Sequence, residues 1–100
     1  MNKNKLKQLW DYEVDVKMWK VIRKTAPDKY IGMIDDIQKE SEKVRNELYE
    51  YILTVEDPYY RVLLTCRFIE RKTWKEVAQI MGGSAESHRK ALSRFIEENL

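Results

Sequence analysis

The stretch "TWKEVAQIMGGSAESHRKALSRF", residues 73–95, contains a short helix signal, two glycines and a second helix signal. Thr73 and Glu76 have the spacing of a capping box, in which each side chain accepts a hydrogen bond from the backbone N–H of the other residue. The two glycines stop this helix after residue 81, because glycine adopts a left-handed turn without steric cost. Ser84 then caps a last helix, which begins at residue 85.

Two helices joined by so few residues cross at a steep angle, and a close crossing needs a small side chain at the contact. Ala78 is that small residue. It follows the apolar Val77, and Met81 and Gly82 come at the turn, which together is the pattern of a helix-turn-helix. Gly83 departs from this pattern, since an apolar residue usually follows the turn.

On a helical wheel the last helix has an apolar face and a polar face. The apolar face consists of Ala85, His88, Leu92, Phe95 and Ile96. The polar face consists of Glu86, Ser87, Lys90, Ser93 and Arg94, with Arg89 at its border. We interpret His88 as a packed, hydrogen-bonded core imidazole, although an aliphatic residue is usual at this position.

The polar face of the last helix has the chemistry of a DNA-reading surface, because a helix fits the major groove and its first half reaches the bases. Base-edge contacts are predicted for Glu86, Ser87 and Lys90, with Ser93 on the same face. Contacts to phosphates or groove walls are predicted for Arg89, Arg94 and Ser84. Flanking phosphate contacts are predicted for Arg67, Arg71, Lys72 and Lys75.

The composition indicates one all-α domain. The chain has 100 residues, of which 43% are hydrophobic and 36% charged, with only three glycines and two prolines. A single cysteine, Cys66, and a single histidine exclude a disulfide framework and a closed zinc site, and we expect no cofactor. No apolar run approaches the roughly 20 residues that span a bilayer, so we expect a cytoplasmic protein without membrane contact.

The net charge of +2 conceals an asymmetry along the chain. Residues 1–24 carry seven basic and three acidic residues. Residues 25–60 carry four basic and nine acidic residues, and residues 61–100 carry eight basic and five acidic residues. Two basic ends therefore flank an acidic middle. This pattern indicates that a polyanion meets the ends while the middle faces solvent or protein; the alternative, which is more common for charge runs, is a face that is only solvated.

The longest regular signal is an apolar seam in residues 30–55, with alternating spacings of four and three. It consists of Tyr30, Ile34, Ile37, Ser41, Val44, Leu48, Tyr51 and Val55. The seam predicts a homodimeric coiled coil, a hairpin in which a first helix, residues 4–23, folds back on it, or both, with one face of residues 30–55 serving each. We favour the hairpin, because the first helix must bury its tryptophans.

The apolar members of this first helix are Leu6, Leu9, Trp10, Val14, Trp19, Val21 and Ile22. Residues 12–18 also alternate between apolar and charged side chains, as in a strand. We prefer a helix, since no partner strand is recognisable and a lone strand leaves its backbone groups unpaired.

A third helix is predicted for residues 58–71, with Asp57 as its cap and Pro58 at its first position. Its apolar residues fall on two sides, which indicates burial on two faces. One side carries Val62, Leu63, Cys66 and Ile69, and the other carries Leu64 and Phe68. The expected organisation is thus a helical hairpin or stalk in residues 1–57, followed by a helix-turn-helix in residues 58–100, with about five helices in one cooperative unit.

The segment "RVLLTCRFIERKTWKEVAQIMGG", residues 61–83, resembles the C-terminal helix-turn-helix of small phage-encoded transcription regulators of the ArpU and RinA type, whose reader is similar to region four of sigma factors. The likeness lies in Arg67, Phe68, Ile69 and the "KTW" and "EVA" runs that follow. "SAESHRKALSRF" resembles the reading helix of some relatives. The resemblance implies a phage or prophage protein that binds double-stranded promoter DNA and contacts RNA polymerase as well.

Two other classes are weighed against this hypothesis. A helical protein-interaction module would use the acidic residues 30–55 to bind a partner such as RNA polymerase. A variant is a small terminase subunit, in which the DNA-binding helix-turn-helix usually lies near the N-terminus. We expect no enzyme, because the adjacent Asp35 and Asp36 project about 100° apart on a helix and no activated nucleophile is recognisable.

Overall fold

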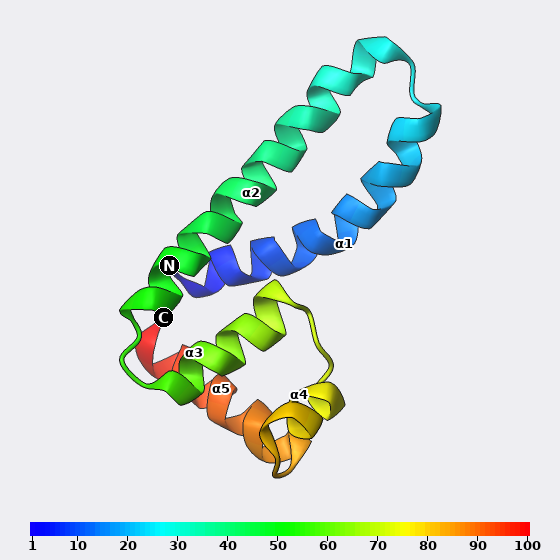
Figure 1. Cartoon of the computed structure of the whole chain (residues 1–100). Coiled ribbons are helices and arrows are strands. Elements are labelled where there is room, and N and C mark those ends of the chain that lie inside the picture. Colours follow the sequence, from blue (N-terminus) through cyan, green and yellow to red (C-terminus); the bar gives the residue numbers. More distant parts are fainter.

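The computed structural model describes the backbone of residues 1–100 and the side chains of residues 1–11 and 20–100. The chain is all-α, as predicted (Figure 1). Its elements are α1 (Lys3–Thr25), the 3-10 turn η1 (Asp28–Tyr30), α2 (Ile31–Thr54), α3 (Pro58–Leu64), the π-helical turn η2 (Thr65–Ile69), α4 (Trp74–Met81) and α5 (Ala85–Asn99). The molecule measures 48 × 25 × 18 Å.

The helices α1 and α2 form the long arm of the molecule, and the shorter helices gather at the end where the two termini lie (Figure 1). Asn2 caps α1 by accepting a hydrogen bond from the Lys5 backbone N–H. Leu6 of α1 is buried in one cluster with Val44 and Leu48 of the seam. The predicted hairpin is therefore confirmed, and α1 covers the part of the seam that a coiled-coil partner would need.

Several residues that were predicted to lie in the hairpin core are exposed. Val21 is 65% exposed and Ile22 and Tyr30 are also exposed, because they lie near the far end of the arm, where only the two helices meet. Ile52, which the seam did not include, is buried. The predictions for Val14 and Trp19 concern side chains outside the described residues.

The third helix ends at Ile69, two residues before the predicted end, because its last turn is π-helical. The Glu70 N–H donates to the Thr65 carbonyl, and Arg71 then adopts a φ of +55° that ends the helix. Leu63 and Leu64 are both fully buried, as expected for a helix covered on two faces. Val62 is 39% exposed, contrary to prediction. It lies before the π-helical turn, which rotates Cys66 and Ile69 relative to Val62, so the three residues do not share one buried face.

One continuous core crosses the expected boundary at residue 57. Leu9 of α1, Leu63 and Leu64 of α3, Val77 of α4 and Leu92 of α5 belong to the same buried cluster. The arm and the C-terminal helices are thus packed around shared side chains. Within the described part of the chain, no helix is both long and apolar enough to cross a membrane.

Candidate nucleic-acid interface

The predicted capping box is present at the start of α4. The Glu76 N–H donates to Thr73 Oγ1 at 3.2 Å, and the Thr73 N–H donates to Glu76 Oε1 at 3.1 Å. Hydrogen bonds from the Thr73 backbone and side chain lower the pKa of Glu76 below its ordinary value of 4.5. The local sequence therefore sets where α4 begins.

The turn between α4 and α5 uses both glycines in the left-handed region. Gly82 has a φ of +78° and Gly83 a φ of +72°. The Gly82 N–H closes α4 by donating to the Ala78 carbonyl at 2.8 Å. Ser84 opens α5 by accepting from the Ser87 N–H at 3.0 Å, as predicted. The helices α4 and α5 are consequently separated by only three residues.

His88 holds this turn to the rest of the molecule. Its side chain is buried, with Nε2 2.6 Å from the Gly82 carbonyl oxygen and Nδ1 2.7 Å from the Tyr59 hydroxyl oxygen. A Cβ atom added at Gly83 would lie 3.5 Å from Nε2. The prediction of a packed, hydrogen-bonded imidazole is confirmed, and the two departures from the helix-turn-helix pattern, Gly83 and His88, lie against each other.

The predicted reading face of α5 points away from the core. His88 and Leu92 are buried, whereas every predicted contact residue of this helix is exposed. These exposed residues are Ser84, Glu86, Ser87, Arg89, Lys90, Ser93 and Arg94. The polar side chains of the face are thus brought together on one accessible surface.

Part of this face is internally paired. Glu86 accepts two hydrogen bonds from the Arg89 guanidinium, one of them at 2.9 Å, and lies 3.9 Å from Lys90 Nζ. The bonds from Arg89 lower the pKa of the Glu86 carboxyl. A ligand that needs Arg89 must therefore compete with Glu86.

Two other cations have no such competitor. Among the described residues, no side chain forms a hydrogen bond or an ion pair with Arg94 or Lys75, and both are exposed. Lys72 differs, because it is half-buried and its Nζ lies 3.3 Å from Glu70. Lys72 is therefore less available to a phosphate than predicted.

Arg67 and Arg71, for which flanking phosphate contacts were predicted, are half-buried and pack against aromatic rings, which makes them less available to phosphates. The Arg67 guanidinium lies over the rings of Trp10 and Trp74, 4.5 and 5.0 Å from their centroids. Arg71 lies 3.9 Å from the Trp10 centroid and donates to the Trp10 carbonyl at 2.8 Å. Trp10 also meets Phe68 edge-on, at 6.2 Å between centroids.

This cluster around Trp10 joins the arm to the helix-turn-helix, and it was not predicted from the sequence. The available signal was the high number of arginines and aromatic residues in residues 67–74, which suits cation–π contacts. A second link is the ion pair of Lys3 with Glu97, at 2.8 Å.

Comparisons with protein-family models, with characterised proteins and with solved structures found no match to this chain. The chemistry of the site is therefore inferred from its own geometry. A short helix, a tight turn and a second helix present hydroxyl, guanidinium and ammonium donors on one exposed face, and such donors suit phosphate oxygens and base edges.

Proposed function

We propose that this protein binds double-stranded DNA through α5 and regulates transcription. The observation that carries the proposal is the division of α5 into two faces. His88 and Leu92 anchor the helix in the core, while Lys90 and Arg94 remain exposed one turn apart on the opposite side. A helix held in this way enters a major groove without unfolding any part of the core.

The electrostatics of the face support contact with a polyanion. Arg94 and Lys75 have no ion-pair partner among the described residues, so they approach phosphates without first breaking an internal ion pair. Each phosphate that a cation neutralises releases a counterion, which makes affinity fall steeply with salt. The proposed base contacts come from Glu86, Ser87 and Lys90, with Ser93 beside them.

The biological setting that we propose is that of a phage or prophage regulator, on the strength of the resemblance of residues 61–83 to the ArpU and RinA type. One reading helix covers too little DNA for tight selective binding, so a second copy or RNA polymerase is proposed as an additional partner. A second copy would have to use surfaces other than the seam between α1 and α2.

The proposal is tested by measuring binding to duplex DNA by fluorescence anisotropy at several salt concentrations. Lys90→Ala and Arg94→Ala should each weaken binding at low salt and reduce the slope of log affinity against log salt by about 0.9 for each phosphate that the variant no longer neutralises. Lys39→Ala, on an exposed part of α2, is the matched control and should behave as the parent. Absence of binding at low salt, or identical behaviour of all three variants, would reject the proposal.

A further variant, Glu86→Gln, distinguishes contacts to base edges from electrostatic attraction to phosphates. Removing this carboxylate frees Arg89 and Lys90 and removes a repulsion toward phosphates, so affinity for random DNA should rise. If Glu86 accepts a hydrogen bond from a cytosine, the same variant should bind more weakly than the parent to a specific DNA sequence obtained by selecting the tightest binders from a random pool. An unchanged affinity for both DNAs would exclude Glu86 from the interface.

The alternative function is a protein-interaction module, and the exposed side of α2 favours it. Leu53 is 78% exposed and Tyr49 is also exposed, next to the acidic Glu50. A partner bound there should be lost in Leu53→Asp and retained when Lys90 and Arg94 are both replaced by glutamate. The opposite result would favour the DNA-binding proposal.

A further inference from the structure

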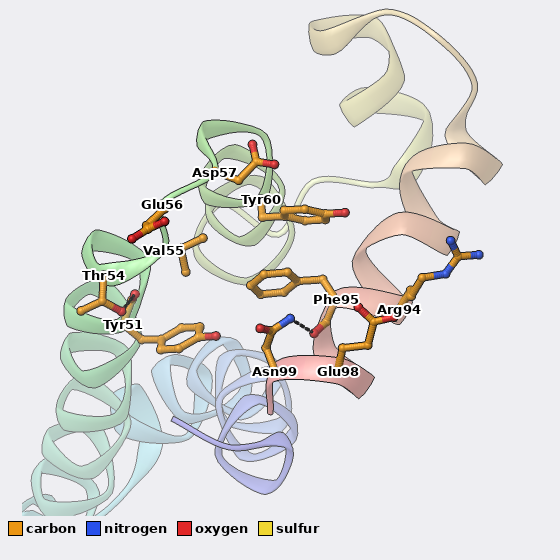
Figure 2. Close-up of a pocket in the computed structure, with 10 residues that line it drawn as sticks. All are labelled: Tyr51, Thr54, Val55, Glu56, Asp57, Tyr60, Arg94, Phe95, Glu98 and Asn99. Atoms are coloured by element: carbon orange, nitrogen blue, oxygen red, sulfur yellow. Dashed lines mark hydrogen bonds between the residues drawn. The ribbon is translucent and has the colours of Figure 1, made fainter.

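A cavity of about 480 Å³ lies where the C-terminal ends of α2 and α5 meet the loop that leads into α3. Figure 2 shows its walls, which come from all three helices and from this loop. The cavity is separate from the turn between α4 and α5. Neither proposed function assigns a ligand to this cavity.

Aromatic rings form one side of this cavity. Tyr60 stacks on Phe95 with centroids 4.5 Å apart and ring planes 20° apart. Tyr51 faces them from α2 (Figure 2), and its partial burial raises the pKa of its hydroxyl. Val55 closes the cavity near α3. A ligand in the cavity thus meets flat aromatic surfaces.

Carboxylates form the rim. Glu56 and Glu98 are exposed, and neither has an ion-pair partner among the described residues. Asp57 also lines the cavity, although one of its oxygens accepts from the Tyr59 N–H. The one basic residue in the lining is Arg94, whose guanidinium extends away from the aromatic rings (Figure 2). The rim therefore has an excess of negative charge.

The backbone adds to this negative potential. α2 ends at Thr54 and α5 at Asn99, so the cavity lies beside the negative ends of two helix dipoles. At the end of α2 this potential is partly neutralised by Arg61, whose guanidinium donates to the Val55 carbonyl. The positive end of α3 also borders it, but Asp57 caps that end. Free carboxylates, aromatic faces and helix C-termini all favour a cation.

We propose that this cavity binds a guanidinium group. A guanidinium is flat and weakly hydrated, so it stacks on an aromatic ring such as Tyr51 and also donates paired hydrogen bonds to a carboxylate such as Glu98 or Glu56. An ammonium group is more strongly hydrated and lacks the planar shape. The preferred ligand is therefore an arginine-like cation.

Guanidinium binding and DNA binding are separate properties of the molecule. Except for Arg94, no residue lining the cavity belongs to the proposed DNA-contact set. The test uses protein without DNA, and its failure would leave the proposal for α5 unaffected.

The experiment is a titration followed by ¹H–¹⁵N NMR on the intact chain, with N-acetyl-L-arginine amide as the probe. Saturable shifts are expected at the backbone amides of Tyr60 and Phe95, with a Kd on the order of 1 mM. N-acetyl-L-citrulline amide has nearly the same shape but no charge, and should bind at least about tenfold more weakly, because a charged donor forms the stronger hydrogen bonds. Equal shifts with the citrulline compound, or no saturable shift with the arginine compound, would overturn the proposal.

Variants locate the site. Glu56→Gln and Glu98→Gln should each weaken binding of the arginine compound about two- to fivefold, as expected for partly exposed charge pairs. Glu40→Gln, on an exposed part of α2 outside the cavity, should leave the affinity unchanged. If all three variants bind alike, the cavity is not the binding site and the proposal fails.

A guanidinium can come from a small molecule or from an arginine side chain of a partner protein. Methylguanidinium serves as the probe for the first source. If it binds as tightly as the arginine compound, only the head group is recognised, which supports a small-molecule ligand. Tighter binding of the arginine compound supports an arginine side chain presented by a polypeptide.

Discussion

The imidazole Nε2 of His88 lies 2.6 Å from the backbone carbonyl oxygen of Gly82. A carbonyl only accepts, so this nitrogen carries the proton, and in neutral His88 the Tyr59 hydroxyl therefore donates to Nδ1, 2.7 Å away. The ring consequently ties the turn before α5 to α3. His88 is therefore one of the buried side chains that orient the proposed reading helix, together with Leu92.

Replacement of His88 should destabilise the fold more than removal of either bond alone. We expect His88→Val to lower the free energy of unfolding by about 1–3 kcal/mol, because it leaves the Gly82 carbonyl and the Tyr59 hydroxyl without a partner. Tyr59→Phe removes one bond and should cost about 0.5–1.5 kcal/mol. Urea unfolding measures both. Tyr49→Phe, at an exposed tyrosine, is the control, and equal stability of all three variants would contradict the prediction.

Two glycine-to-alanine changes should have opposite effects on the stability of the fold. Gly83→Ala should destabilise by about 1–2 kcal/mol, since its φ of +72° places a Cβ in the left-handed region. Gly32→Ala lies in α2 with nothing within 4 Å of the added methyl, and should stabilise by up to about 1 kcal/mol. Thermal unfolding distinguishes the two. A neutral Gly83→Ala would show that the turn relaxes without strain.

The capping box should make stability depend on pH. Because Thr73 lowers the pKa of Glu76 in the folded state, the ionised carboxylate stabilises the fold above its ordinary value of 4.5, and this contribution is lost as pH falls through the lower folded-state pKa. Glu76→Gln should thus be less stable than the parent at neutral pH, with a difference that disappears in acid. Urea midpoints at a series of pH values test this, and a difference that does not change with pH would rule it out.

The cluster around Trp10 should distinguish arginine from lysine. Arg67→Lys keeps the charge but loses a flat group between two indole rings, so we expect a loss of about 0.5–2 kcal/mol in the free energy of unfolding. Arg94→Lys, at an arginine without a described partner, should cost nothing measurable. Chemical unfolding followed by tryptophan fluorescence provides the measurement. Equal effects of the two changes would show that the stacking contributes nothing.

The sequence by itself determined the features that depend on neighbours a few residues apart. The capping box of Thr73 and Glu76, the Ser84 cap and the stop at Gly82 each join groups within four residues, so spacing alone settles them. The split of α5 into a buried and an exposed face follows in the same way from its 3.6-residue period. The hairpin was predicted from the tryptophans that the first helix must bury, but Trp10 packs against Arg67, Arg71 and Phe68. Leu6 of α1 instead shares a buried cluster with Val44 and Leu48 of the seam.

Only the tertiary structure decided which basic side chains stay available. Arg67 and Arg71 carry the same positive charge as Lys90 and Arg94, yet Arg71 bonds to Trp10, 61 residues away in the chain. The cavity beside Phe95 likewise depends on how the arm packs against the last three helices. A local sequence pattern does not predict such contacts, because they join surfaces that meet only after the whole chain has folded.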